Sequence, residues 1–145
     1  MTLYLDTSSL VILYVTESGS EVVRQLVGDS SVVATSVVAY AETRAALARL
    51  RREGMLTAAK LKSAKREFDE QWPTYLRLEA TDSLCRAAGE LVEKYSLRGF
   101  DSIHLASFAE VSRRAGTDDT RFSSFDGRLN QAAEKVKRTL ARSRK

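Results

Sequence analysis

Four carboxylates each stand at or near a predicted strand–helix junction, or on a predicted helix that faces the core. These acids are Asp6, Glu42, Asp101 and Asp126. Parallel strands end at the same edge of a sheet, and open α/β sheets bind their ligands at that edge. We therefore expect the four side chains to meet in one pocket, although they are far apart in the sequence.

Carboxylates gathered in one pocket repel one another unless protons or a cation compensate their charge. Oxygen ligands without a nearby imidazole or thiolate favour hard ions such as Mg²⁺ or Mn²⁺. One or two such ions can activate a water molecule and stabilise the leaving oxygen of a phosphodiester. Because His104 is the single histidine and Cys85 the single cysteine, a zinc site is not expected.

Each acid also has a purely structural explanation, which the sequence alone leaves open. Asp6 could cap the helix that follows it, and Asp101 could be an ordinary acid in the first turn of a helix. Asp126 precedes a glycine, as turn residues commonly do. Glu42 could extend to solvent or pair with Arg44 or Arg98.

The alternation of apolar runs and helical patterns predicts the elements that would bring these acids together. Buried strands are predicted at residues 3–5 and 31–35, a half-exposed strand at 75–79, and a short and polar last strand between 117 and 124. Helices are predicted at residues 10–15, 20–27, 37–50, 57–72, 82–95, 100–115 and from 127 onward, with Ser20 and Ser36 at the starts of two of them. Strands alternating with helices are typical of an α/β fold with a parallel sheet.

Length and composition favour a soluble globular protein. A chain of 145 residues is long enough for one domain with a proper core, and 43% hydrophobic against 29% charged residues argues against disorder. No apolar run approaches the ~20 residues of a membrane span. The first residues carry no basic leader, so we expect no signal peptide. A lone cysteine fits a reducing compartment, and we expect a cytoplasmic location.

Basic residues are concentrated in two places. Residues 127–145 carry seven basic residues and one acid, a balance of +6, whereas the first 126 residues carry a balance of −2. A smaller cluster is Arg49, Arg51 and Arg52. Such patches attract polyanions through counterion release. A solvated helix face would have the same composition, so both explanations stay open for the tail.

Four short segments, taken in order, match the pattern of a known family. They are Leu3-Tyr4-Leu5-Asp6-Thr7-Ser8, then Glu42, then Gly99-Phe100-Asp101-Ser102-Ile103-His104-Leu105-Ala106, and finally Phe122-Ser123-Ser124-Phe125-Asp126-Gly127-Arg128-Leu129 followed by Ala132-Ala133. With these segments the chain resembles, over nearly its whole length, the PIN-domain ribonucleases of the VapC-like toxin group. The resemblance implies a single α/β/α PIN-like domain over residues 1–145 with a central parallel sheet, including the basic helix and tail at about 127–145.

The resemblance also implies a role for each residue of the site. Asp6 and Asp101 would be the most direct metal ligands, Glu42 and Asp126 would complete the shell, and Ser8 and Ser124 would support it. His104 matches a helix position rather than a catalytic base, so we expect it to be a core or surface residue. One departure is the polar segment 117–122, which could let Asp118 or Asp119 approach the cation in place of Asp126.

The activity implied by the resemblance is Mg²⁺- or Mn²⁺-dependent cleavage of RNA by an endoribonuclease, with in-line attack of water that leaves a 5′-phosphate. Basic residues would position the RNA backbone, and the candidates for this are Arg49, Arg51, Arg52 and the tail. The implied partners are the RNA substrate, a small cognate antitoxin and a second copy of the chain in a homodimer. An apolar groove formed by the helices at 10–27 and 37–72 is the expected antitoxin site.

Other functions compete with this interpretation. A catalytically inactive PIN-fold module would bind RNA without cleaving it. A phosphohydrolase with an aspartyl nucleophile, of the haloacid-dehalogenase type, also begins with an apolar strand that ends in Asp. That class usually carries a second Asp two residues later, where this chain has Ser8. The order of the acids does not fit a receiver-like signalling domain.

Overall fold

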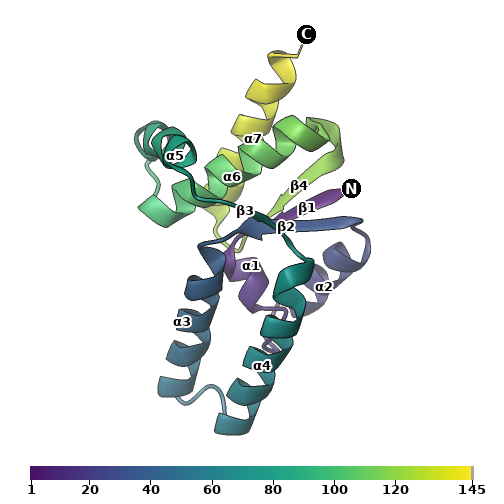
Figure 1. Cartoon of the computed structure of the whole chain (residues 1–145), viewed down its shortest axis with the longest axis vertical. Coiled ribbons are helices and arrows are strands. Elements are labelled where there is room, and N and C mark those ends of the chain that lie inside the picture. Colours follow the sequence, from purple (N-terminus) through teal and green to yellow (C-terminus); the bar gives the residue numbers. More distant parts are fainter. Residues whose placement is uncertain (145) are drawn as a thin grey trace.

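The computed structural model describes residues 1–144, so Lys145, the last residue of the predicted basic tail, lies outside the described residues. Within the described part, four parallel strands form one sheet in the order β3-β2-β1-β4 (Figure 1). The strands are β1 (Thr2–Leu5), β2 (Val32–Ser36), β3 (Leu76–Leu78) and β4 (Thr120–Ser123). This central parallel sheet confirms the predicted α/β fold class.

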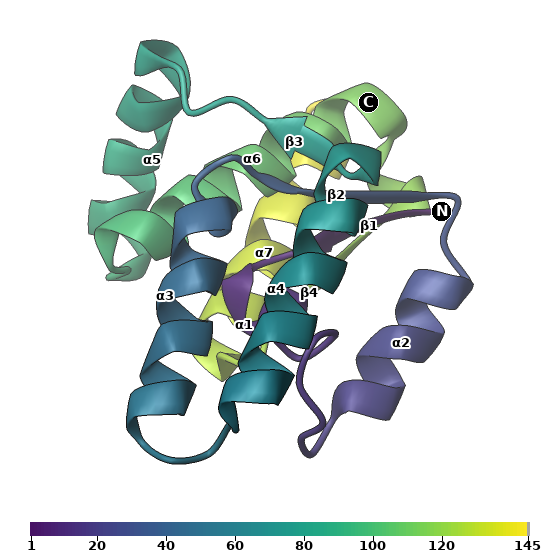
Figure 2. The ribbon, with the colours of Figure 1, turned by 60° about the horizontal axis from the view of Figure 1, so that its bottom comes forward.

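Helices cover both faces of the sheet, with α1 to α4 on one face and α5 to α7 on the other (Figures 1 and 2). Their bounds are α1 (Thr7–Val11), α2 (Ser20–Gly28), α3 (Ala39–Arg52), α4 (Ala58–Gln71), α5 (Asp82–Tyr95), α6 (Gly99–Ala115) and α7 (Gly127–Arg142), with short 3-10 helices η1 (Trp72–Thr74) and η2 (Thr117–Asp119). Among residues 1–144, no helix combines the length and the apolar character that a membrane span requires.

Strand β1 separates two hydrophobic clusters because its side chains alternate between the faces of the sheet. Leu3 and Leu5 belong to the cluster formed with the helices α1 to α4, and Tyr4 belongs to the cluster formed with α6 and α7. All three side chains are fully buried. The strand is therefore packed on both sides, as expected in a parallel sheet, and it holds the residue at its carboxyl end in a rigid setting.

The strand order creates a topological switch point beside β1. The next strand in the chain, β2, pairs with one edge of β1, and the last strand, β4, pairs with the other. Leu5 is aligned with Ser123, and the backbone N–H of Asp6 donates to the Ser123 carbonyl at 3.2 Å. Beyond this point the chain enters α1 after β1 and α7 after β4. Open α/β sheets bind ligands outside the carboxyl ends of their strands at such a switch point, and this region beyond β1 and β4 is called the crevice below.

The helix predicted at residues 10–15 is wrong in its position. Helix α1 starts at Thr7 and ends at Val11, and turns follow it. The reason is that Asp6 caps the helix immediately after β1, with its carboxylate accepting from the backbone N–H of Ser9. The apolar run beyond Val11 fills the core from a turn rather than from a helix.

The predicted roles of Ser20 as the cap of a helix and of Ser36 as the residue that opens one need a similar correction. Gly19 is the residue that caps α2, and the buried hydroxyl of Ser20 lies 3.1 Å from the carbonyl of Ile12, which it stabilises. Ser36 is the last residue of β2, and α3 begins three residues later. In both cases a serine that could cap a helix satisfies another part of the backbone.

Gly19 is predicted to be indispensable for the turn between α1 and α2. Its φ is +91°, and a Cβ there would lie 2.6 Å from Cε1 of Phe125, next to the crevice. We expect Gly19→Ala to destabilise the fold by roughly 1–3 kcal/mol, because the left-handed backbone is strained for alanine and the Phe125 ring must move. Chemical denaturation measures this change.

Gly89→Ala is the matched control, since an added Cβ at this position in α5 meets no atom within 4 Å. It should stabilise the protein by about 0.5–1 kcal/mol through helix propensity. Equal stability changes in the two variants would contradict the importance of the Gly19 turn.

Candidate active site

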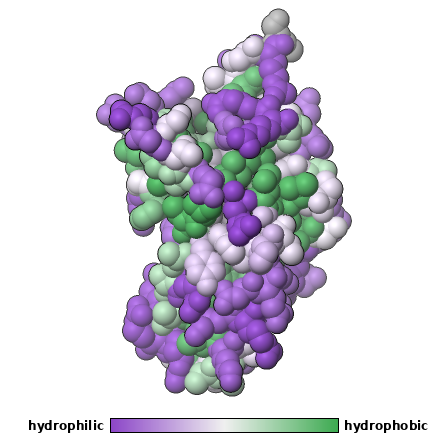
Figure 3. All heavy atoms as spheres, viewed as in Figure 1, coloured by the Kyte–Doolittle hydropathy of each residue, from purple (hydrophilic) through white to green (hydrophobic). Residues whose placement is uncertain are grey.

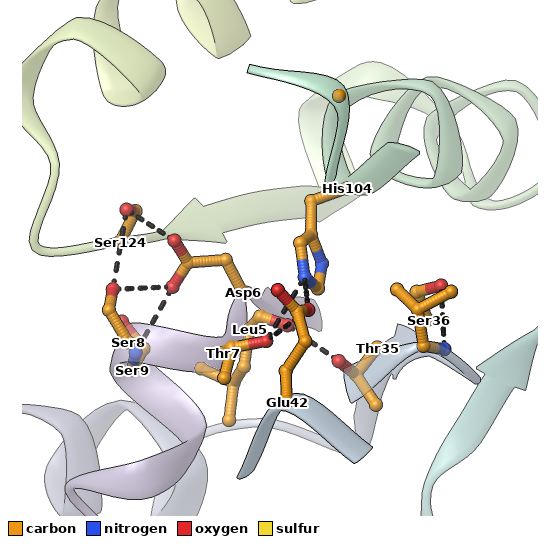
Figure 4. Close-up of polar contacts among 12 residues, drawn as sticks. Leu5, Asp6, Thr7, Ser8, Ser9, Thr35, Ser36, Glu42, His104 and Ser124 are labelled. Atoms are coloured by element: carbon orange, nitrogen blue, oxygen red, sulfur yellow. Dashed lines mark hydrogen bonds and ion pairs between the residues drawn. The ribbon is translucent and has the colours of Figure 1, made fainter. Parts of the chain in front are cut away.

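Asp6 lies at the switch point directly after β1 and is 5% exposed. Both of its carboxylate oxygens accept hydrogen bonds (Figure 4). Oδ1 accepts from the Ser8 hydroxyl at 2.7 Å and the Ser9 backbone at 3.0 Å, and Oδ2 accepts from the Ser124 hydroxyl at 2.6 Å. Asp6 therefore caps α1, and its carboxylate is also held in one orientation at the edge of the sheet.

Ser8 and Ser124 approach Asp6 from two segments of the chain that are far apart in the sequence. The Ser8 hydroxyl also accepts from the backbone N–H of Phe125 at 3.0 Å, and the Ser124 hydroxyl accepts from that of Asp126 at 2.9 Å. Each hydroxyl thus donates to the carboxylate and accepts from the loop between β4 and α7. These bonds join that loop to the start of α1.

Glu42, in the first turn of α3, is held by two hydrogen bonds to a single oxygen. Its Oε1 accepts from the Thr7 hydroxyl at 2.7 Å and lies 2.9 Å from Nε2 of His104. Neither bond uses Oε2. Burial raises the pKa of Glu42, but the hydrogen bonds from His104 and Thr7 and the attraction of His104 outweigh it, so the pKa lies below its ordinary value of 4.5.

Asp101 and Asp126 stand at the starts of the two helices that face Asp6 from the other side. Asp101 lies in the first turn of α6, and its pKa is raised, first by burial and then by the negative charges of Asp126 and Asp6, against the opposing charges of His104 and Arg98. Asp126 caps α7, accepting from the backbone of Arg128 at 2.9 Å. Asp126 therefore has the structural role that the sequence predicted for it at a turn. Its carboxylate also adds a negative charge that acts on Asp101.

The structure thus places Asp6, Asp101 and Asp126 in one electrostatic neighbourhood. Glu42 joins it through Thr7, the residue after Asp6, and through His104, which lies one helical turn beyond Asp101. No cluster of three or more His, Cys, Asp or Glu side chains in a metal-holding arrangement is found within residues 1–144. The acids of the described residues therefore lie near one another without forming a complete set of metal ligands.

The donor set nevertheless fits a hard divalent cation. The side chains at the crevice offer carboxylate and hydroxyl oxygens, and burial together with the charges of Asp126 and Asp6 raises the pKa of Asp101 there. Mg²⁺ is commonly held by only one or two carboxylates and keeps several waters, so a complete protein cage is not needed. Asp6, with its fixed orientation, and Asp101 would hold such an ion.

The alternative in which Asp118 or Asp119 replaces Asp126 is wrong. Both acids lie in η2, before β4, and Asp119 pairs with the amino group of Met1 at 3.5 Å. Because β1 and β4 are parallel, this pair lies at the amino ends of the strands. Asp6 lies at their carboxyl ends.

Two residues at the crevice were not predicted to be part of the site. His104, expected to be a core or surface residue, is indeed buried, at 1% exposure, but it contacts Glu42. Thr7 bridges Glu42 and His104. The spacing of Asp101 and His104, three residues apart on one helix, would have placed both on one helix face. That spacing was the available signal.

A family model described as the PIN domain matches residues 3–128. The chain belongs to the PIN-domain family. It is 37% identical over 108 residues to ribonuclease VapC45 of Mycobacterium tuberculosis (strain CDC 1551 / Oshkosh) and to ribonuclease VapC49 of Mycobacterium tuberculosis (strain ATCC 25618 / H37Rv). These matches cover 74% of this chain and 75% of each relative. They confirm the resemblance predicted from the four sequence segments.

The PIN fold of this chain is also seen in a solved structure, that of VapC20 of Mycobacterium tuberculosis, a toxin that cleaves the sarcin–ricin loop. The TM-score is 0.65, with 21% identity over 90% of this chain and 94% of that one. At this identity the likeness establishes the shared fold, with a central parallel sheet between helices, and nothing more.

Most residues of the two basic clusters of this PIN domain lie away from the crevice, at the end of α3 and along α7, and Arg128 in the first turn of α7 is the exception. Helix α7 starts at the crevice with Gly127, and its 16 residues carry the chain about 24 Å away before the tail. Arg49, Arg51 and Arg52 close α3, roughly 10–15 Å beyond Glu42 along the helix axis. Arg98, the residue directly before α6, has a charge that acts to lower the pKa of Asp101.

Asp101→Asn is expected to raise the thermal unfolding midpoint of the metal-free protein at pH 7. A raised pKa means that the ionised carboxylate is less favourable in the folded than in the unfolded chain, so above both pKa values its charge opposes folding. Scanning calorimetry in EDTA measures the gain. It should shrink as the pH falls through the raised pKa towards the ordinary value of 3.8.

The exposed Asp118, in η2, provides the control. Asp118→Asn should leave the unfolding midpoint almost unchanged. A lower midpoint for Asp101→Asn than for the wild type across this pH range would show that Asp101 supports the fold rather than straining it.

Glu42→Gln is expected to have the opposite effect on stability. The lowered pKa of Glu42 means that its charge stabilises the fold above about 4.5, and that this stabilisation is lost as the pH falls through the lowered value. The variant should therefore unfold at a lower temperature than the wild type at pH 7, and the two should converge in acid. Glu53→Gln, at the exposed end of α3, should show little change. A deficit independent of pH would mean that packing, not charge, holds Glu42.

Proposed function

We propose that this chain is a metal-dependent endoribonuclease that acts as the toxin of a toxin–antitoxin pair. The observation that carries the proposal is the gathering of acids at the ends of β1 and β4 of a PIN domain, where burial, and then the charges of Asp126 and Asp6, raise the pKa of Asp101. The names of the relatives VapC45 and VapC49, both ribonucleases, support RNA as the substrate class.

In this proposal each acid of the site has a distinct part. Asp6 and Asp101 hold a divalent cation directly, and Glu42 and Asp126 complete its surroundings. A bound Mg²⁺ or Mn²⁺ supplies the positive charge that activates water and stabilises the leaving oxygen of a phosphodiester. The hydroxyls of Ser8 and Ser124 keep the Asp6 carboxylate oriented, which their short hydrogen bonds support.

Arg98 is the arginine that we propose for contact with an RNA phosphate near the cleaved bond. Its charge acts on Asp101, and its side chain is exposed. The basic ends of α3 and α7 lie farther from the crevice and would attract the RNA at longer range, without sequence preference. This division replaces the earlier expectation that the tail positions the reacting backbone.

The proposed antitoxin site is a groove of about 730 Å³ between α2, β2 and the segment that joins α4 to β3. Its apolar lining includes Leu13, Val27, Tyr75 and Leu76. Figure 3 shows hydrophobic surface across the middle of one face of the molecule, between hydrophilic ends. An amphipathic segment of a small antitoxin would cover such a surface. A homodimer, a cytoplasmic location and a single domain over residues 1–145 belong to the same proposal.

Asp6→Asn and Asp101→Asn should each abolish cleavage of RNA while leaving the protein folded. Each removes one negative charge from the crevice, and we expect a loss of activity of at least ~100-fold. The assay is cleavage of total or ribosomal RNA by the wild-type protein with Mg²⁺, with Mn²⁺ and with EDTA, read on a denaturing gel. Circular dichroism checks that the variants are folded.

Asp118→Asn, which changes an exposed acid at the opposite edge of the sheet, should keep wild-type activity. Cleavage that survives EDTA, or wild-type activity in either crevice variant, would contradict the proposal. Binding of RNA without turnover by the wild type would instead indicate the catalytically inactive module.

A further inference from the structure

Glu42, His104, Thr7 and Tyr4 form one hydrogen-bonded chain at the edge of the sheet (Figure 4). They come from four elements, since Tyr4 lies in β1, Thr7 in α1, Glu42 in α3 and His104 in α6. Helices α3 and α6 cover opposite faces of the sheet. The imidazole therefore reaches past the sheet edge and joins a helix of one layer to a helix of the other.

The proton positions in this hydrogen-bonded network follow from the Glu42 carboxylate, which is the acceptor at one end of it. An ionised carboxylate can only accept, so the Nε2 of His104 donates to Oε1 of Glu42 across 2.9 Å. Nε2 also lies 3.1 Å from the Thr7 hydroxyl oxygen, which can accept because its own proton points to Glu42. The other ring nitrogen, Nδ1, is 2.8 Å from the Tyr4 hydroxyl.

The ring itself cannot turn away from this arrangement. His104 is 1% exposed and Tyr4 is fully buried, and the two rings meet edge to face with centroids 5.9 Å apart. The Glu42 side chain is by contrast 28% exposed. A buried, fully partnered donor thus fixes one oxygen of a half-buried carboxylate, and neither of the bonds to Glu42 engages its second oxygen.

We propose that His104 is a positioning residue that fixes Glu42 so that the free carboxylate oxygen Oε2 faces the cation of the crevice. The inference rests on the proposed metal-dependent function. It goes beyond that function because the family resemblance gives His104 no role in the site. Removing a residue that hydrogen-bonds to a metal ligand and orients it typically weakens metal affinity by about 10–100-fold.

The test measures Mn²⁺ affinity by electron paramagnetic resonance, together with kcat and KM for RNA. We expect His104→Leu to weaken Mn²⁺ binding by about 10–100-fold and to lower kcat at saturating Mn²⁺, with little change in KM. His104→Gln, whose amide can donate near the position of Nε2, should restore most of the affinity. Phe108→Leu, which loses packing against Tyr4 one turn along α6, controls for a loosened core and should keep wild-type affinity.

A double-mutant cycle distinguishes action through Glu42 from general damage. If His104 acts through Glu42, adding His104→Leu to Glu42→Gln should cost almost no further Mn²⁺ affinity. Losses that multiply, a His104→Leu variant with wild-type affinity, or a Gln variant as weak as the Leu variant would each overturn the inference.

Two further outcomes are separated by design. If His104→Leu does not fold, Tyr4→Phe removes only the hydroxyl on Nδ1 and should weaken Mn²⁺ binding by about 2–10-fold; unchanged affinity there overturns the inference. If the wild type binds Mn²⁺ but cleaves no RNA, the ribonuclease proposal fails, whereas the Mn²⁺ titrations still decide the role of His104.

Discussion

Negative charges held close together in a partly buried crevice are the constraint on which the rest of the site depends. Burial and the charges of Asp126 and Asp6 raise the pKa of Asp101, so the folded chain holds this carboxylate at a cost. Carboxylates whose pKa is shifted by burial and by neighbouring charges are candidates for functional residues, because an unfavourable charge is retained where it serves a function. A hard divalent cation is the partner that would relieve it.

The fold creates this constraint by directing the first turns of several helices to one place. Asp6 caps α1, Glu42 lies in the first turn of α3, Asp101 in that of α6, and Asp126 caps α7. The N-terminus of a helix favours negative charge, because its free N–H groups point towards it. The parallel sheet supplies the geometry, since β1 and β4 end side by side and their following helices diverge. The same helix ends that tolerate the acids therefore bring them together.

The sequence predicted the elements well where patterns were long and periodic, as in α4, α5 and α6. It failed where a polar residue had two possible partners. Ser20 could cap a helix or bind the Ile12 carbonyl, and only tertiary contacts decide between them. The sequence did not predict that His104 belongs to the site for the same reason. Its hydrogen-bond partner there, Glu42, lies 62 residues away in the sequence. Asp119 was excluded only when the direction of β4 was known.

The central claim is that the crevice of this PIN domain holds a hard divalent cation between Asp6 and Asp101. The most direct measurement is an anomalous difference map from crystals grown with Mn²⁺. The expected result is a peak within bonding distance of an oxygen of each of these two carboxylates, which Mg²⁺ in excess displaces. Well-ordered acids with no peak between them, or a peak elsewhere on the molecule alone, would contradict the claim.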